Sequence, residues 1–216
     1  GCRLRLALLP SLPFRMIINS YRFAASGTGY LLDDYAGASA GYSLRALSSS
    51  YQTTNAVVQV RRTGDATLDT FTAEEVTDGT LASWVTSGGG TENGHVRTFY
   101  DQSGNGNNTS QTINSRQPLI VSGGVLLADG LKFDGTDDYF DCGFAAGSAT
   151  GQSVMVVAQT SDLTANRMML DGRDANDDGL AMFFMGGTTA DLVRWSVDSS
   201  ADPTGNDLFT GSLSAN

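Results

Sequence analysis

The sequence contains very little lysine, histidine and cysteine. Lys132 is the only lysine among 13 basic residues, His95 is the only histidine, and the formal net charge is −10. Because the chain has no basic stripe to neutralise phosphates, we expect no electrostatic binding to nucleic acid. It has no apolar run of about 18 residues, so we expect no membrane span.

The two cysteines, Cys2 and Cys142, fall in a predicted tail and a predicted strand. A disulfide and two separate thiols both stay open, and their spacing does not fit a zinc site. Glutamate is also scarce: only Glu74, Glu75 and Glu92 are glutamates among 23 acidic residues. Aspartate favours turns where glutamate favours helices, so this skew, together with 26 glycines, indicates many short strands.

The stretch 99–108, FYDQSGNGNN, is the densest concentration of turn-forming residues. Gly104 and Gly106 adopt positive φ at little cost, and asparagine bonds its own backbone readily. We therefore predict a compact, self-bonded loop between a strand at 96–100 and a return strand at 117–121. An ordered turn and a binding or catalytic loop are both open interpretations.

Apolar runs separated by Gly/Asp turns predict strands along most of the chain. The further predicted strands are 56–62, 68–71, 124–127, 131–133, 139–142, 154–159, 168–170, 180–185 and 192–197. In the second half, their spacing of about a dozen residues is typical of an all-β, two-sheet antiparallel β-sandwich. We predict helices at 31–50, capped by Asp33 or Asp34, and at 79–87 around Leu81 and Trp84.

The first 29 residues differ from the rest and are interpreted as an extended N-terminal arm ahead of one sandwich domain at 30–216. Residues 1–15 resemble a broken signal peptide or an extension ahead of Met16. The peptide 16–23, MIINSYRF, is apolar and aromatic, and strand addition to a neighbouring protein would satisfy its backbone. The partner-binding residues that we predict in it are Ile17, Ile18, Tyr21, Arg22 and Phe23.

Four short motifs carry a resemblance: YSLR at 42–45, VRR at 60–62, YDQSGNGNN at 100–108 and QP at 117–118. Together they resemble the opening of family 54 α-L-arabinofuranosidase catalytic domains. The resemblance covers roughly residues 30–121 and implies a β-sandwich.

The second half departs from that family. In the family, a glutamate nucleophile lies in a buried strand, and the matching strand here, LAMFFMG at 180–186, has Ala181 in its place. The family's vicinal cysteine pair is missing, and its acid/base segment would fall after Asn216. Retaining glycosidases need two carboxylates, so we predict a non-catalytic relative.

Two further resemblances concern the fold and the setting of the protein. LKFDGTDDYFDCG at 131–143 resembles an early strand pair of laminin-G-like, concanavalin-type jelly rolls. MIINSYRF is similar to peptides that open tailed-phage structural proteins, often ahead of such a module. The resemblances imply a jelly roll that is part of a virion and assembles as a homo-oligomer. They also imply that its sheet is completed by further strands after Asn216 or by a neighbouring protein.

Two groups of candidate site residues stand out. For glycan contact we predict Tyr100, Asp101, Gln102, Asn105 and Asn107. Ca²⁺ is the only cofactor that we predict. Its candidate ligands are the carboxylates of Asp134, Asp137 and Asp138, with Asp141 nearby. The alternative is a solvated turn whose aspartates bond local amides. A second cluster, Asp171, Asp174, Asp177 and Asp178, has some of the spacing of a calcium loop without its closing glutamate.

Four other residues are of types that occur in functional sites. His95 lies in a Gly/Asn-rich turn without an evident acid–base partner, and we interpret it as a surface residue. Trp84 and Trp195 suit either sugar stacking or the core. Ser103 lacks a nucleophile-elbow context and is interpreted as a turn residue.

The leading hypothesis is a non-catalytic structural or adhesion module of a phage virion: a tail-associated, fibre or capsid-decorating protein that assembles through its arm and contacts glycan. The alternatives are a secreted, lectin-like carbohydrate-binding domain and, third, an arabinofuranosidase-like hydrolase. Saturable sugar binding would favour the second, and turnover of an arabinofuranoside the third.

Overall fold

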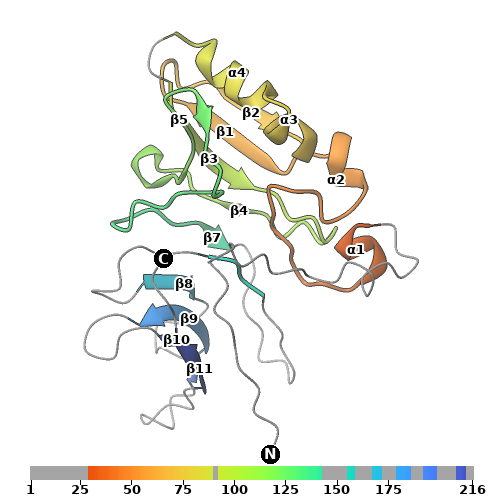
Figure 1. The fold of residues 1–216 in the computed structure, drawn as a ribbon, viewed down its shortest axis with the longest axis vertical. Helices are drawn as coiled ribbons and strands as arrows, with labels where there is room; N and C mark the ends of the chain where they lie inside the picture. The colour runs from red at the N-terminus through yellow and green to blue at the C-terminus, as the bar shows by residue number, and fades with distance from the viewer. Residues whose placement is uncertain are drawn as a thin grey trace, which may run out of the picture.

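A computed structural model describes residues 29–89, 92–142 and 155–158, and the backbone of four strands between 167 and 212. The described part is mainly antiparallel β-structure with short helices, which confirms the expected β-rich class (Figure 1). The predicted arm residues Ile17, Ile18, Tyr21, Arg22 and Phe23 lie outside the described residues.

The described strands form two antiparallel sheets. The order of the first is β2-β1-β3-β4-β7, with β5 pairing β3 and β6 pairing β5. Its strands are β1 (Val58–Arg62), β2 (Leu68–Phe71), β3 (Gly94–Phe99), β4 (Thr109–Ser110), β5 (Leu119–Ser122), β6 (Val125–Leu126) and β7 (Asp141–Cys142). The order of the second is β11-β10-β9-β8, built from β8 (Arg167–Asp171), β9 (Gly179–Met185), β10 (Leu192–Asp198) and β11 (Leu208–Ser212).

Two helices, α3 (Ala73–Thr77) and α4 (Thr80–Thr86), cover the first sheet (Figure 1). The helices and the strands share one buried cluster, in which Leu81 and Val85 of α4 join Val58, Val60 and Val96. All five side chains are 0% exposed. Burying such a side chain contributes about 1.5–3 kcal/mol. The second layer of this core is therefore helical.

Local sequence explains both helices. The Thr72 hydroxyl accepts from the Glu75 amide at 3.3 Å, and the Glu75 carboxylate accepts from the Thr72 amide at 2.9 Å, which is a capping box. Gly79, at φ 96°, separates α3 from α4, a conformation that glycine adopts without a Cβ penalty. The helix predicted at 79–87 is confirmed as α4, whereas α3 was not predicted.

The helix predicted at 31–50 is wrong. Only α1 (Leu31–Asp34) and α2 (Ser50–Thr53) form, one at each end of the range. Residues 35–48 between them are irregular, and Gly37 has φ 99°. Within this segment, residues 38–47 are called the strap. The strap backbone bonds to side chains of a distant loop and not to its own preceding turn.

The strand predicted at 154–159 is also not formed where the structure describes it. Residues 155–158 have no regular structure, and Met155 and Val157 are 80% and 97% exposed. An apolar run becomes a strand only with a partner, and these four residues pair with no described strand. The other predicted strands mostly correspond to observed ones, although 131–133 contributes only a bridge between Lys132 and Leu119.

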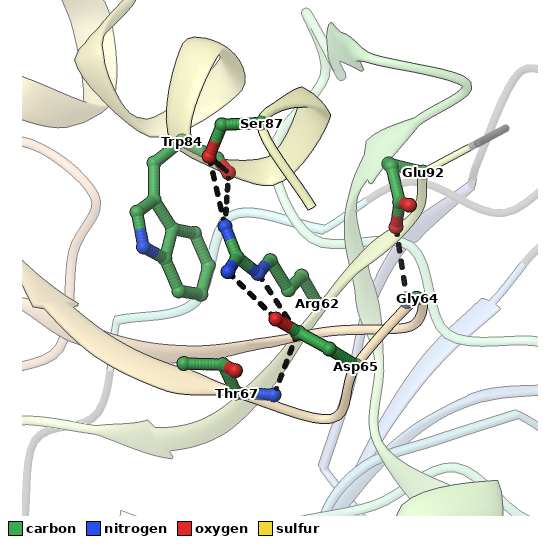
Figure 2. A network of polar contacts seen from close by, with 7 residues as sticks. All are labelled: Arg62, Gly64, Asp65, Thr67, Trp84, Ser87 and Glu92. Carbon is green, nitrogen blue, oxygen red and sulfur yellow. Dashed lines mark hydrogen bonds and ion pairs between the residues drawn. The ribbon is translucent and has the colours of Figure 1, made fainter. Parts of the chain in front are cut away.

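Arg62, the last residue of β1, joins the β1–β2 turn to α4 (Figure 2). Its guanidinium makes two bonds to Asp65, of 2.8 and 2.7 Å, and donates to the Trp84 carbonyl at 2.9 Å and the Ser87 hydroxyl at 2.8 Å. On the same turn, the Gly64 amide donates to buried Glu92 at 3.0 Å. The hairpin and the helix are thus fixed to each other by polar contacts as well as by the core.

Candidate functional site

The loop at 100–108 is compact and self-bonded, as predicted. The Asp101 carboxylate accepts from the Ser103 amide at 2.8 Å, the Ser103 hydroxyl at 2.7 Å and the Asn107 amide at 3.0 Å. Gly104 and Gly106 have φ 87° and 73°, which lets the chain turn tightly around this carboxylate. Ser103 is a turn residue, as interpreted from the sequence.

The loop is also bonded to the strap, residues 38–47. The Gly41 amide donates to Asp101 Oδ1 at 2.8 Å, and the Gln102 amide donates back to the Gly41 carbonyl at 2.8 Å. The buried Gln102 side chain donates to the Ser43 carbonyl at 2.7 Å and accepts from the Leu47 amide at 2.7 Å. Side chains of the loop thus satisfy the strap backbone, which explains why this segment is not helical.

Asparagine side chains of the loop continue the same pattern. Asn105 Nδ2 donates to the Ala38 carbonyl at 2.8 Å and the Ser39 carbonyl at 3.2 Å, and Asn107 Nδ2 donates to the Ser39 carbonyl at 2.8 Å. Two of the motifs compared with family 54, YSLR and YDQSGNGNN, contact each other directly, because Gln102 Nε2 donates to the Ser43 carbonyl.

Two tyrosine hydroxyls, one from the strap and one from α2, donate to the loop backbone. Tyr42 donates to the Asn107 carbonyl, and Tyr51 of α2 donates to the Asp101 carbonyl at 2.9 Å. Burial raises the pKa of both tyrosines and is the largest cause for each. The next cause is the charge of Asp101 for Tyr51 and the electrostatic effect of Cys142 for Tyr42. Both phenols therefore stay protonated at neutral pH and act as donors.

Asp101 is the charged centre of this arrangement and is 2% exposed. Burial alone would raise its pKa, but the hydrogen bonds from Ser103, Gly41 and Asn107 outweigh burial and lower the pKa. Asp101 is thus a buried, ionised carboxylate whose oxygens are taken by four donors. It stabilises the loop and is not a free nucleophile.

A cavity of about 350 Å³ lies beside the loop. Its lining combines half-buried aromatic rings, exposed amides and glycine backbone: Tyr51, Asn55, Ala56, Tyr100, Asp101, Gly104, Gly106 and Asn108. Of the predicted glycan residues, Tyr100 and Asp101 line this cavity. Gln102, Asn105 and Asn107 do not, because their side chains bond to the strap.

Sequence reasoning missed Tyr51, Asn55 and Asn108. The first two lie on and just after α2, shortly beyond the range 31–50 that was predicted to be one long helix. Asn108 belongs to the loop, but its amide could not be distinguished from those of its neighbours by residue type. The tertiary fold brings Tyr51 and Asn55 to the loop: Tyr51 donates to the Asp101 carbonyl, and the Tyr100 amide donates to the Val57 carbonyl, two residues after Asn55.

Asp134, Asp137 and Asp138 do come together, with one carboxylate oxygen from each within 4.8 Å of the others. Asp134 Oδ1 accepts from the amides of Thr136, Asp137 and Asp138, at 2.8 to 3.2 Å. Asp138 Oδ2 accepts from the Asp134 amide at 2.9 Å, and Asp137 lies 3.3 Å from Arg116 Nε. The cluster is built as a turn that bonds its own amides, so its geometry favours the solvated-turn alternative over Ca²⁺ binding, and both stay predictions.

The backbone bonds lower the pKa of Asp134, the amide of Thr136 contributing most. Burial raises the pKa of Asp138. Asp141 is in β7 and accepts through its carbonyl from the Thr109 hydroxyl at 2.9 Å. In the second acidic cluster Asp171 ends β8, while Asp174, Asp177 and Asp178 lie outside the described residues.

His95 is half-buried, so the surface interpretation is corrected. It pairs with Arg61 across β1 and β3, and its Nδ1 lies 3.0 Å from the Gln117 carbonyl. Burial lowers its pKa. Trp84 packs on Phe71, with 5.2 Å between the rings, and is partly buried against the core. Trp195 is in β10. Cys142 is an exposed free thiol, and Cys2 lies outside the described residues.

The chain matches no protein-family model, no curated protein and no solved structure. Within the described residues, no helix is long and apolar enough to cross a membrane.

Proposed function

We propose that this protein is a non-catalytic structural and adhesion module of a phage virion, attached through its N-terminal arm, with the cavity beside the loop contacting glycan. The observation that carries the glycan contact is the lining of that cavity, where Tyr51 and Tyr100 lie with the amides of Asn55 and Asn108. Ligand sites typically combine aromatic surface with a few placed polar groups.

The chemistry of the cavity supports binding rather than hydrolysis. Asp101 is the one carboxylate in the lining, and four hydrogen bonds occupy its oxygens. A retaining or inverting glycosidase uses two carboxylates on either side of the scissile bond. An arabinofuranosidase-like activity is therefore the weaker proposal.

The laminin-G-like jelly roll is part of the proposal. Such a fold packs two antiparallel sheets face to face, and the chain has two antiparallel sheets. Because α3 and α4 cover one face of the first sheet, the second sheet would pack on the opposite face. The virion setting and the assembly with neighbouring virion proteins rest on MIINSYRF at 16–23.

The test of the structural role is assembly and particle association. The full chain and a chain lacking residues 1–23 are compared by light scattering and by sedimentation with purified particles. We expect the full chain to form a defined oligomer or to sediment with particles, and the truncated chain to stay free. The double substitution Ile17→Asp/Ile18→Asp should act like the truncation. Equal behaviour of all chains would contradict the arm as an assembly element.

A secreted lectin-like domain is the second candidate, and one observation favours it: every lining residue of the cavity lies between 51 and 108, outside the arm. The truncated chain should then bind a glycan array as the full chain does. Sugar binding without any particle association would replace the virion proposal with this one.

A further inference from the structure

We infer that the cavity beside the loop selects an uncharged sugar ring and rejects acidic sugars. The inference rests on the proposed glycan contact and adds the class of ligand. It is carried by the volume of the cavity, its aromatic and amide lining, and the buried charge of Asp101.

The volume suits a small ligand. A cavity of about 350 Å³ is at the lower end of the range for small-molecule sites, about 300–1,000 Å³. Tyr51 and Tyr100 are both half-buried and supply ring surface for the C–H face of a sugar. Their hydroxyls differ in use, since that of Tyr51 already donates to the Asp101 carbonyl. Because this bond holds the Tyr51 side chain in place, Tyr51 offers the ligand its ring and not its hydroxyl donor.

The polar groups are neutral amides. Asn108 Oδ1 accepts from the Asp101 amide at 3.0 Å, which fixes the side chain, and no described residue accepts from its Nδ2. Asn55 lies two residues after α2, and its exposed side chain offers both a donor and an acceptor. Two amides of this kind complement sugar hydroxyls, which donate and accept in the same way.

Glycine keeps the loop side of the cavity open. A Cβ built on Gly104 or Gly106 would meet no atom within 4 Å, so the space beside the backbone is free. A ligand can approach the main chain closely at both positions.

Asp101 sets the charge preference. Hydrogen bonds keep its carboxylate ionised at neutral pH, and the lining contains no lysine, arginine or histidine to offset it. A carboxylate on the ligand would meet a like charge of reduced solvent exposure, where repulsion is less screened than in water. The net charge of −10 acts in the same direction at longer range.

The test uses sugar pairs that differ only in a carboxylate. The full chain is titrated with glucose against glucuronate and with galactose against galacturonate, and binding is followed by calorimetry or NMR. We expect the neutral member of at least one pair to bind about tenfold or more tightly than its acidic counterpart. Equal or tighter binding of the acidic members would overturn the inference and leave the proposed glycan contact standing.

Two asparagine variants locate the binding. Asn55→Ala should weaken neutral-sugar binding about tenfold at an unchanged thermal midpoint, because this side chain is exposed. Asn114→Ala is the matched control: its side chain is also exposed, and only its backbone carbonyl is used, by Arg61. Sugar binding unaffected by Asn55→Ala would place the site elsewhere and overturn the inference. No binding of any sugar would overturn both the inference and the glycan part of the proposed function.

Discussion

Arg62 lies over the ring of Trp84, with 4.8 Å between the guanidinium carbon and the ring centroid, and also donates to the Trp84 carbonyl. Trp84 is in the last turns of α4, so a strand residue supplies the cation and the donors that a helix C-terminus favours (Figure 2). One side chain therefore joins a hairpin, a helix end and an aromatic ring.

Arg62→Lys should lower the thermal midpoint. Lysine keeps the charge but loses the planar fork that bonds Asp65 twice while stacking on the ring. Thermal unfolding followed by circular dichroism measures the change. Arg45→Lys is the control, since Arg45 is exposed and its side chain makes no hydrogen bond or ion pair with a described residue. Equal midpoints for the two variants would contradict a stabilising role.

Leu81→Ala should destabilise the protein by about 2–5 kcal/mol, because it opens a cavity between α4 and the first sheet. Leu81 is 0% exposed, while Leu31, which is 45% exposed, provides the control Leu31→Ala with an expected change within about 0.5 kcal/mol. Urea denaturation measures both. A small effect at Leu81 would mean that the helical layer does not form this core.

Asp101→Asn should cost about 1–3 kcal/mol, since an amide nitrogen would face donors that now share a carboxylate. Because the folded pKa of Asp101 is lowered, its contribution is present above the unfolded pKa of about 3.9 and is lost as pH falls through the folded value. The wild-type protein should thus lose more stability than the variant as the pH falls from about 4 towards the lowered folded pKa. The exposed Asp129→Asn provides the control. Parallel pH profiles for wild type and Asp101→Asn would contradict this assignment.

Asp69→Ala should promote self-association. β2 is at one end of the first sheet, and the Asp69 carboxylate accepts from the Thr70 amide at 2.8 Å. An occupied N–H and a charge on an edge strand both discourage edge-to-edge pairing. The substitution removes both, because it frees the Thr70 N–H and deletes the Asp69 carboxylate. In the chain lacking residues 1–23, light scattering across a concentration series should show oligomers for Asp69→Ala and none for Asp129→Ala. Unchanged monomers would mean that the edge is protected by other means.

Adding 1 mM Ca²⁺, or a chelator, should leave the thermal midpoint unchanged. Calcium needs about six to eight oxygens, whereas Asp134 and Asp138 already bond local amides and Asp137 lies beside Arg116. A midpoint that rises with Ca²⁺ and does not rise in Asp134→Asn would establish a cation site at this turn.

Local signals predicted well what depends on local physics. The alternation at 56–62 and 68–71 predicted β1 and β2, and the Gly/Asn content of 99–108 predicted a self-bonded loop. The signal for α3, a threonine followed three residues later by a glutamate, was present at Thr72 and Glu75 but was not used.

The strap could not be predicted from local signals. Its apolar spacing favours a helix, but the bonds that decide its conformation come from Asp101, Gln102 and Asn105, about 60 residues away. Similarly, residue types alone marked five polar side chains of the loop as ligand contacts. Four of them bond to the strap, and three of these four, Gln102, Asn105 and Asn107, do not line the cavity. Whether a polar side chain points outwards or inwards depends on the partner that the fold brings to it.

The bond between Gly41 and Asp101 spans 60 residues of chain, and this has a consequence for the order of folding. The β1–β2 hairpin and the α3–α4 pair can form from neighbouring residues, whereas closing a long loop is entropically costly and slow. On a ribosome, the strap emerges well before its hydrogen-bonding partners exist. We therefore expect residues 38–47 to be ordered late, after the hairpin and the helices, and the cavity that depends on them to be assembled last.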